Sequence, residues 1–510
     1  MTAVVPPSRR GACPALTAPM ATGDGLLVRL VPVDGALSPE ALVGLCDAAL
    51  AFGNGILEVT ARGSLQLRGL RAETVGPLND AVNRLGIAAR EGVPLDVSPL
   101  AGLEAGAASD ARRLAAEIRA AISGFAVRLG PKVSVVIDDG GAISLAALKA
   151  DIRLTRWIAE ADAASPLGAS GGAPNEIAPP AETSEPARWA IALAGDAATA
   201  RALGSLPEGR LVAVVADLLE QLAQLGPTAR MTDVLRTTDL QTLRHQRAMA
   251  PPNGEETAPQ SAPAISATPS SKTAPATALP PSEPHPAPAP IASFPLADGT
   301  VALGIGLPFG HGDAATLKTL VAAAQAAGAR DLRPAPGRVL LATHLTPTGA
   351  AELRAAAAAL GFLTEADDPR RFVAACAGAP ACASAHIPAR TLAPEVAATL
   401  APILDGSLEV HVSGCPKGCA HPATAALTLV GVAPDAMDKT VALVREGKAG
   451  DATQPIQTVA ALLPTLARFA AALAAARRPG ETSAEALTRL SPPDAPGPAL
   501  LEFAVLESAP

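Results

Sequence analysis

Tyrosine is absent from this chain, and aromatic side chains make up only 2 % of its 510 residues. Proteins that bind single-stranded nucleic acid without sequence preference stack bases on aromatic side chains, and this composition leaves little for such a platform. The formal net charge is −8, and no run of lysines or arginines is present. The basic stripe that marks most nucleic-acid-binding proteins is therefore missing, and we expect no nucleic-acid partner.

Long apolar runs are also lacking. A membrane-spanning helix needs about 18 or more apolar residues, and no stretch of the chain reaches this length without a charge. Arg9 and Arg10 stand near the start, but the apolar run of a twin-arginine export signal does not follow them. We expect a cytoplasmic protein that has no membrane partner.

Cysteine is scarce, and its distribution is uneven. Six cysteines are too few for a disulfide scaffold in a chain of this length. Four of the six lie between Cys376 and Cys419. Such clustering indicates metal chemistry in a reducing compartment.

Hydrophobic residues make up 49 % of the chain, and they are arranged in two similar segments. Residues 26–70 align with residues 301–345 without a gap, which indicates an internal duplication. The matched pairs are Gly35 with Gly310, Gly53 with Gly328, Leu57 with Leu332, Leu65 with Leu340, and Leu70 with Leu345. Each copy predicts a strand, a turn, a helix, two strands and a second helix. This order is typical of an α+β unit with helices on one face of a small sheet.

The two copies differ in their polar side chains. The first copy carries Thr60, Arg62, Gln66 and Arg68, where the second copy has Ala335, Gly337, Leu341 and Thr343. Cationic groups on one copy only suggest that this copy faces an anionic ligand. An exposed strand face, where arginine is ordinary, is the alternative.

The cysteine pattern is C-x5-C at Cys376 and Cys382, followed by C-x3-C at Cys415 and Cys419. Four thiolates that converge on one centre are what a [4Fe–4S] cluster requires, and the glycines and prolines around them provide tight turns. A structural zinc site is an alternative, although zinc knuckles favour closer cysteine pairs. Unliganded cysteines and disulfides are the remaining alternatives.

The cysteine motif, with its S-G-C-P-x-G-C ending, resembles that of the sirohaem-dependent sulfite and nitrite reductases. The segment VTARGSLQLRG at 59–69 is similar to the T-x-R-Q-x-x-Q segment of that family. The resemblance implies an α+β, duplicated nitrite/sulfite reductase-like architecture with ferredoxin-like half-domains and an iron–sulfur domain. It also implies that Arg62, Gln66 and Arg68 bind tetrapyrrole carboxylates, for which guanidinium forks are well suited.

Composition marks two linkers, and together with the resemblance it predicts a division of the chain into eight parts. They are 20–88 for the first half-domain, 89–160 for a cluster-type domain without cysteines, 161–187 for a linker, 188–249 for the rest of the first half, 250–294 for a Pro/Ala/Ser-rich linker, 295–365 for the second half-domain, 366–480 for the [4Fe–4S] domain and 481–510 for a C-terminal tail.

Three departures from the reductases concern the groups that bind an oxyanion. Lys132 is present, but Ser134 stands where the reductases have a second lysine. Leu27 stands at the first position of an R-x-R pattern and leaves only Arg29. The R-N-V segment of the reductases is replaced by Glu91-Gly92-Val93. These losses argue against a small oxyanion as substrate.

One branch of the superfamily resembles the chain more closely. The segments GDGLLVRL, GNG, SPLAGLE, DDGG and SGCPKGCAHP are similar to those of the precorrin-3B synthase family of aerobic cobalamin biosynthesis. This resemblance implies a monooxygenase that hydroxylates precorrin-3A at C20 with lactone formation, using O2 and NADH. It implies a mononuclear non-haem iron besides the [4Fe–4S] cluster.

The implied roles can be stated residue by residue. Arg62, Gln66, Arg68 and Lys132 would bind the substrate carboxylates, and His386 and His421 would bind the iron. No G-x-G-x-x-G motif follows a strand, so electrons from NADH would arrive through a separate reductase. A sirohaem-dependent sulfite or nitrite reductase and a non-catalytic iron–sulfur electron carrier remain as alternatives.

Overall fold

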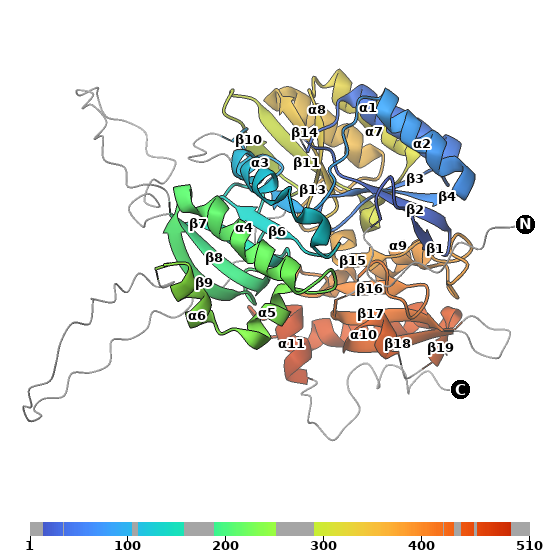
Figure 1. Ribbon diagram of the computed structural model, residues 1–510. Coiled ribbons are helices and arrows are strands. Elements are labelled where there is room, and N and C mark those ends of the chain that lie inside the picture. The colour runs from blue at the N-terminus through green and yellow to red at the C-terminus, as the bar shows by residue number, and fades with distance from the viewer. Residues whose placement is uncertain are drawn as a thin grey trace, which may run out of the picture. The chain divides into compact units, whose positions relative to one another are not determined.

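The computed structural model of the chain describes residues 14–33, 35–104, 111–157, 188–250, 290–421, 423–432, 440–452 and 456–490 (Figure 1). The linker expected at 161–187 lies outside these ranges, as do residues 251–289 of the one expected at 250–294. The chain forms two compact units. One unit combines the residues up to Glu91 with those from Ala289 onward, and the other extends from Gly92 to Pro288.

The first repeat builds one sheet of the first unit. Its elements are β1 (Met20–Thr22), β2 (Gly25–Leu30), α1 (Pro39–Phe52), β3 (Ile56–Val59), β4 (Leu65–Leu70) and α2 (Ala72–Arg84). The strand order is β1-β2-β4-β3-β12, and all neighbours are antiparallel. Helix α1 begins after Ser38, whose side chain accepts a hydrogen bond from the Ala41 amide at 3.1 Å.

The second repeat follows the same plan. Its elements are β10 (Ser293–Pro295), β11 (Val301–Gly306), β12 (His311–Asp313), α7 (Ala314–Ala326), β13 (Leu332–Ala335), β14 (Val339–Leu345) and α8 (Pro347–Ala359). Four of its strands form an antiparallel sheet in the order β10-β11-β14-β13.

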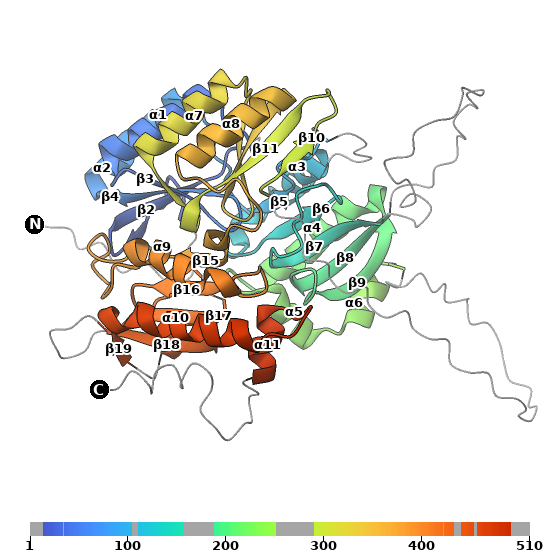
Figure 2. The same cartoon turned by 180° about the vertical axis from the view of Figure 1, so that it is seen from behind.

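Backbone pairing joins the two repeats, which share one core. Strand β12 of the second repeat pairs with β3 of the first, which sets Gly312 opposite Leu57. Leu37 of the first repeat pairs in turn with Leu332 of the second. Gly312 is the repeat equivalent of Leu37, and Leu332 is that of Leu57, so the exchange is reciprocal. Helices α1 and α7 pack side by side, and the apolar residues of both repeats form one core (Figures 1 and 2).

The cysteines belong to a third sheet domain within the first unit. Its elements are β15 (Val373–Ala375), α9 (Ala389–Leu400), β16 (Val410–Ser413), β17 (Ala425–Val432), β18 (Thr440–Gly447), β19 (Ile456–Thr458), α10 (Val459–Ala476) and α11 (Ser483–Leu490). Strands β15, β16 and β17 are parallel, and β18 and β19 run antiparallel to their neighbours. Helices α9 and α10 pack against each other and against one face of this sheet (Figure 2).

Helix α10 is the one helix among the described residues that is long and apolar enough to span a membrane by length and composition. Its Leu462, Leu466, Phe469 and Leu473 are buried in the core of the sheet domain. The core helix of a compact domain passes the same test, so the helix is weak evidence for a membrane span.

The second unit repeats the topology of the cysteine-bearing domain. Its elements are β5 (Leu95–Val97), α3 (Ala111–Ile122), β6 (Val135–Asp138), β7 (Ala150–Trp157), β8 (Arg188–Gly195), β9 (Arg201–Pro207), α4 (Glu208–Gln224), α5 (Met231–Thr237) and α6 (Leu240–Gln246). The strand order is β5-β6-β7-β8-β9, with the first three strands parallel and the last two antiparallel to their neighbours. The duplication therefore extends beyond the two segments that align in sequence, and the α+β class expected from the sequence is confirmed.

One feature of the C-terminal part differs from the expectation. Residues from 481 onward were expected to form a tail, whereas Ser483–Leu490 form α11, in which Ala486 and Leu487 are buried. Asp405 fixes the start of this helix by accepting a hydrogen bond from the Ser483 amide at 2.8 Å. A contact with a residue so far away in the chain gives no local sequence pattern.

Five short 3-10 helices complete the described elements of both units. They are η1 (Ala126–Arg128), η2 (Pro308–Gly310), η3 (Pro369–Phe372), η4 (Ala401–Ile403) and η5 (Ala449–Asp451).

Candidate functional site

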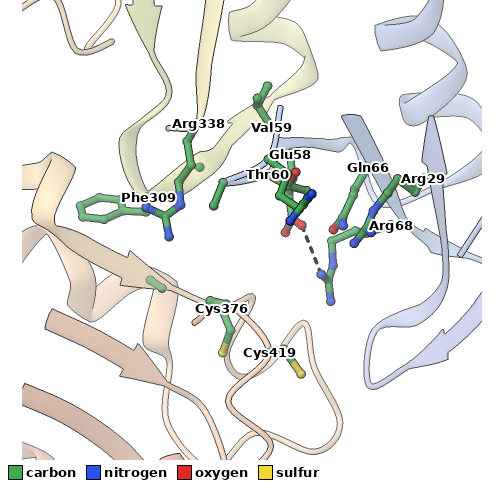
Figure 3. Close-up of a pocket in the computed structure, with 15 residues that line it drawn as sticks. Arg29, Glu58, Val59, Thr60, Gln66, Arg68, Phe309, Arg338, Cys376 and Cys419 are labelled. Atoms are coloured by element: carbon green, nitrogen blue, oxygen red, sulfur yellow. Dashed lines mark hydrogen bonds and ion pairs between the residues drawn. The ribbon is translucent and has the colours of Figure 1, made fainter. Parts of the chain in front are cut away.

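A cavity of ≈ 240 Å³ lies within the first unit, between the first repeat, the second repeat and the cysteine loops. Its polar lining residues are Arg29, Glu58, Thr60, Arg62, Gln66, Arg68, Arg338, Cys376 and Cys419. Figure 3 shows Arg29, Gln66 and Arg68 on one side, Arg338 and Phe309 on the other, and Cys376 and Cys419 below them. The cavity thus unites three of the predicted ligand-binding residues with two of the predicted cluster ligands.

The strand pair β3–β4 aims these polar groups into the cavity. Successive side chains of a strand point to opposite faces, so Gln66 and Arg68 share a face while Leu65 and Leu67 are buried in the core. Gln66 lies opposite Glu58 on β3 and opposite Arg29 on β2. One row of polar groups therefore crosses three neighbouring strands.

Gln66 connects the two charged members of this row. With its amide turned so that the nitrogen faces the carboxylate, the nitrogen donates to Glu58 Oε2 at 2.9 Å. The amide oxygen then accepts from Arg29 Nη2 at 2.7 Å. Gln66 is 8 % exposed, and its buried amide holds Glu58 and Arg29 in place.

Arg68 is held by carboxylates of the protein itself. Its Nε and Nη2 each donate to Asp24 at 2.8 Å, and Nη1 donates to Glu58 Oε2 at 3.3 Å. Burial opposes ionisation of Asp24, but the hydrogen bonds and charge of Arg68 outweigh it and lower the pKa of this carboxyl. Arg68 was expected to bind a substrate carboxylate, whereas here the same donors bind Asp24 and Glu58.

Arg62 lines the cavity from the turn between β3 and β4. Its backbone pairs with Pro336 of the second repeat, so this turn rests on the turn between β13 and β14. The Thr60 hydroxyl accepts a hydrogen bond from the Ser64 amide at 3.0 Å and closes the loop.

Phe309 and Arg338 were not expected to belong to the site. Both come from the second repeat, line the cavity and have left-handed backbone conformations, with φ of 58° and 66°. Such conformations are rare for residues other than glycine and gather at functional sites. Burial lowers the pKa of the Arg338 guanidinium, and the charge of Glu409 opposes this effect.

The four cysteines of the two motifs are free thiols in two loops that contact each other. The Cys376 sulfur accepts a hydrogen bond from the Gly414 amide at 3.1 Å, and Lys417 Nζ donates to Ser384 Oγ at 2.8 Å. Burial raises the pKa of both Cys376 and Cys419, and the neighbouring thiols raise it further. The hydrogen bonds between the two loops bring the two cysteine pairs together.

Four thiols in two contacting loops have the chemistry that a [4Fe–4S] cluster requires of its ligands. Among the described residues, no group of three or more His, Cys, Asp or Glu side chains is placed to hold one metal ion. The amide that donates to Cys376 is typical of the surroundings of a cluster thiolate.

Neither predicted iron ligand belongs to a metal-holding group of three or more side chains among the described residues. The His386 amide donates to the Gly414 carbonyl at 2.7 Å, whereas the His421 ring lies 5.7 Å from the His411 ring and its Nε2 lies 3.5 Å from Glu409 Oε2. The described residues therefore supply no three-ligand site for a mononuclear iron. The roles of His386 and His421 as ligands stay predictions.

Lys132 lies in the second unit, in an exposed turn before β6. The cavity is lined by residues of the first unit only. The structure thus does not add Lys132 to the site, and its role stays a prediction.

The duplicated fold and the cavity define the class of protein. A model of the nitrite/sulfite reductase ferredoxin-like half domain matches residues 18–85. The structure of the Mycobacterium tuberculosis NirA protein matches 91 % of this chain and 83 % of its own chain, with a TM-score of 0.59. The sequence identity is 18 %, so this similarity concerns the fold alone. The sulfite reductase [NADPH] hemoprotein beta-component of Xanthomonas euvesicatoria pv. vesicatoria is 35 % identical over 112 residues, 20 % of each chain. The chain is a member of the nitrite/sulfite reductase superfamily.

One relative matches nearly the whole chain. The precorrin-3B synthase of Sinorhizobium sp. is 36 % identical over 486 residues, which cover 94 % of this chain and 93 % of the relative. The chain belongs to the precorrin-3B synthase family. The resemblance that the sequence motifs indicated is confirmed.

Proposed function

We propose that this protein is a monooxygenase that converts precorrin-3A to precorrin-3B in aerobic cobalamin biosynthesis. The observation that carries the proposal is the 36 % identity over almost the full length of both this chain and a precorrin-3B synthase. The reaction hydroxylates C20 and forms a lactone. One oxygen atom of O2 enters the substrate, the other leaves as water, and NADH supplies two electrons.

The chemistry of the cavity supports a tetrapyrrole substrate. Four arginines and one glutamate line it, so its charge suits a ligand with several carboxylates. Arg62 would bind a carboxylate directly, and Gln66 and Arg68 would hold Glu58 and Arg29 in place. The oxyanion-binding groups of the reductases are incomplete, since Leu27 and Ser134 replace two cations.

The four thiols indicate the cofactor, and the lack of a dinucleotide-binding motif indicates how the electrons arrive. Cys376, Cys382, Cys415 and Cys419 would hold a [4Fe–4S] cluster, which supplies single electrons when bound. Cys376 and Cys419 line the cavity, so electrons would enter beside the substrate. NADH would act through a separate reductase, because the chain has no dinucleotide-binding fingerprint.

The test begins with anaerobic purification and analysis of iron, sulfide and extractable tetrapyrrole. We expect at least four irons per chain, equimolar cluster sulfide and no sirohaem, followed by O2-dependent conversion of precorrin-3A. Cys419→Ser should lose iron and sulfide, whereas Cys46→Ala, in helix α1 away from the cavity, should keep both.

Two other outcomes would point to other functions. Extractable sirohaem together with sulfite or nitrite reduction would contradict the proposal, and the local similarity to a sulfite reductase makes this the second candidate. If the cluster is intact but neither precorrin-3A nor an oxyanion is converted, the remaining interpretation is an electron carrier.

A further inference from the structure

The turn that carries Arg338 can be compared with the equivalent turn of the first repeat. The gapless alignment of the repeats places Arg338 opposite Gly63. Both residues are left-handed, with φ of 66° and 78°. Glycine adopts this conformation without steric cost, whereas other L-residues do so at a cost of about 1 kcal/mol. The second repeat therefore keeps a strained arginine where the first repeat has a glycine.

Gly310 leaves room for the Arg338 side chain. A Cβ atom built on Gly310 would lie 2.6 Å from Arg338 Cδ and 3.2 Å from Nε. Any other residue at 310 would push the side chain away from its present place. The Leu307 amide donates to the Arg338 carbonyl at 2.9 Å and fixes the backbone. The space left by Gly310 and the hydrogen bond from Leu307 thus keep the Arg338 cation in the cavity wall.

Arg338 and Arg68 differ in what they bind. Arg68 directs Nε, Nη1 and Nη2 to Asp24 and Glu58. No described carboxylate lies within ion-pair distance of Arg338, and its guanidinium makes no hydrogen bond to a described residue. A partly desolvated cation whose donors are not engaged gains more from an incoming anion than one that is already paired.

We infer that Arg338 is the residue that binds a carboxylate of the tetrapyrrole ligand on the second-repeat side of the cavity, and that Arg68 is a positioning residue. The inference rests on the proposed function, because that function supplies a ligand with several carboxylates. Backbone strain at position 338 is retained because the guanidinium serves binding rather than folding.

The experiment measures binding and stability on the same variants of the full chain. The probe is uroporphyrin, a metal-free tetrapyrrole with eight carboxylates, titrated by its fluorescence. Arg338→Gly should weaken binding at least about tenfold, the loss expected for a charge-assisted hydrogen bond. Its thermal unfolding midpoint should be unchanged or higher, because glycine relieves the strain. Arg338→Lys keeps the charge without the fork and should bind with intermediate affinity.

Arg330→Ala is the matched control, since this arginine is exposed, belongs to the same repeat and does not line the cavity. Its affinity for uroporphyrin should equal that of the unmodified protein. Undiminished binding by Arg338→Gly, or a clear loss of its stability, would overturn the inference and leave the proposed function intact. If the unmodified protein does not bind uroporphyrin, that result would instead contradict both the inference and the proposed function.

Discussion

The pair formed by Asp24 and Arg68 shows how two residues far apart in the chain shape the cavity. Asp24 lies in the turn between β1 and β2, and its side chain is only 1 % exposed. Removing one partner of a buried ion pair leaves the other charge without compensation. Asp24 thereby determines where the Arg68 guanidinium stands and, through it, where Glu58 stands.

Asp24→Asn should lower the free energy of unfolding by about 3 kcal/mol at neutral pH. The pKa of Asp24 is lowered from its ordinary value of 3.8, so its contribution is complete above that value and is lost as the pH falls through the folded-state pKa. The difference in stability between the two proteins should therefore shrink below about pH 4. Denaturant unfolding at a series of pH values measures it.

Asp80→Asn, on the exposed surface of α2, is the control and should change stability by less than about 0.5 kcal/mol. A difference for Asp24→Asn that grew on acidification would contradict the assignment of the pair.

At the scale of elements, the turn between β1 and β2 rests directly on the first cysteine loop. The Ala383 amide donates to the Gly23 carbonyl at 2.6 Å. A Cβ atom built on Gly23 would lie 2.2 Å from the Cys382 sulfur and 3.0 Å from the Ser384 amide nitrogen. The half-domain and the cysteine loop therefore fit only when residue 23 has no side chain.

Gly23→Ala should displace the loop of Cys382, lower the free energy of unfolding by about 1–3 kcal/mol and reduce the iron and sulfide bound per chain. Anaerobic purification with metal analysis, together with thermal unfolding, provides the measurement. Gly76→Ala is the matched control, because nothing lies near the added methyl group in helix α2. It should be neutral or stabilising by up to about 1 kcal/mol, and full cluster content in Gly23→Ala would refute the contact.

At the scale of the whole molecule, the two repeats fold around one core rather than two. Strand β12 completes the sheet of the first repeat, and Leu37 pairs with Leu332 of the second. Apolar residues of α1, α7 and α8 belong to the same cluster. Neither repeat can bury its apolar surface alone.

The first repeat expressed alone, residues 14–91, should consequently be insoluble or unfolded, and it should copurify as a 1:1 complex with the rest of the first unit, residues 289–490, when the two are expressed together. Affinity purification through a tag on one fragment, followed by circular dichroism, tests this expectation. A fragment 14–91 that is soluble by itself and unfolds cooperatively would contradict the shared core.

Much of this architecture was predictable from the sequence, because the glycines and leucines of the two repeats recur in register. The meeting of Arg62, Gln66 and Arg68 with the cysteines followed from resemblance to a known family. The partner of Arg68 was not predictable, since Asp24 meets it only through the pairing of β1, β2 and β4. Arg338 could have been recognised as a bulky residue where the first repeat has Gly63, but no motif marks it.

The exchange of strands between the repeats also bears on which substitutions the chain can accept. The backbone of Gly312 pairs with that of Leu57 in the opposite copy. A substitution in one repeat therefore alters a surface on which the other repeat packs. Neither copy can be redesigned by itself, because each supplies part of the sheet and core of the other.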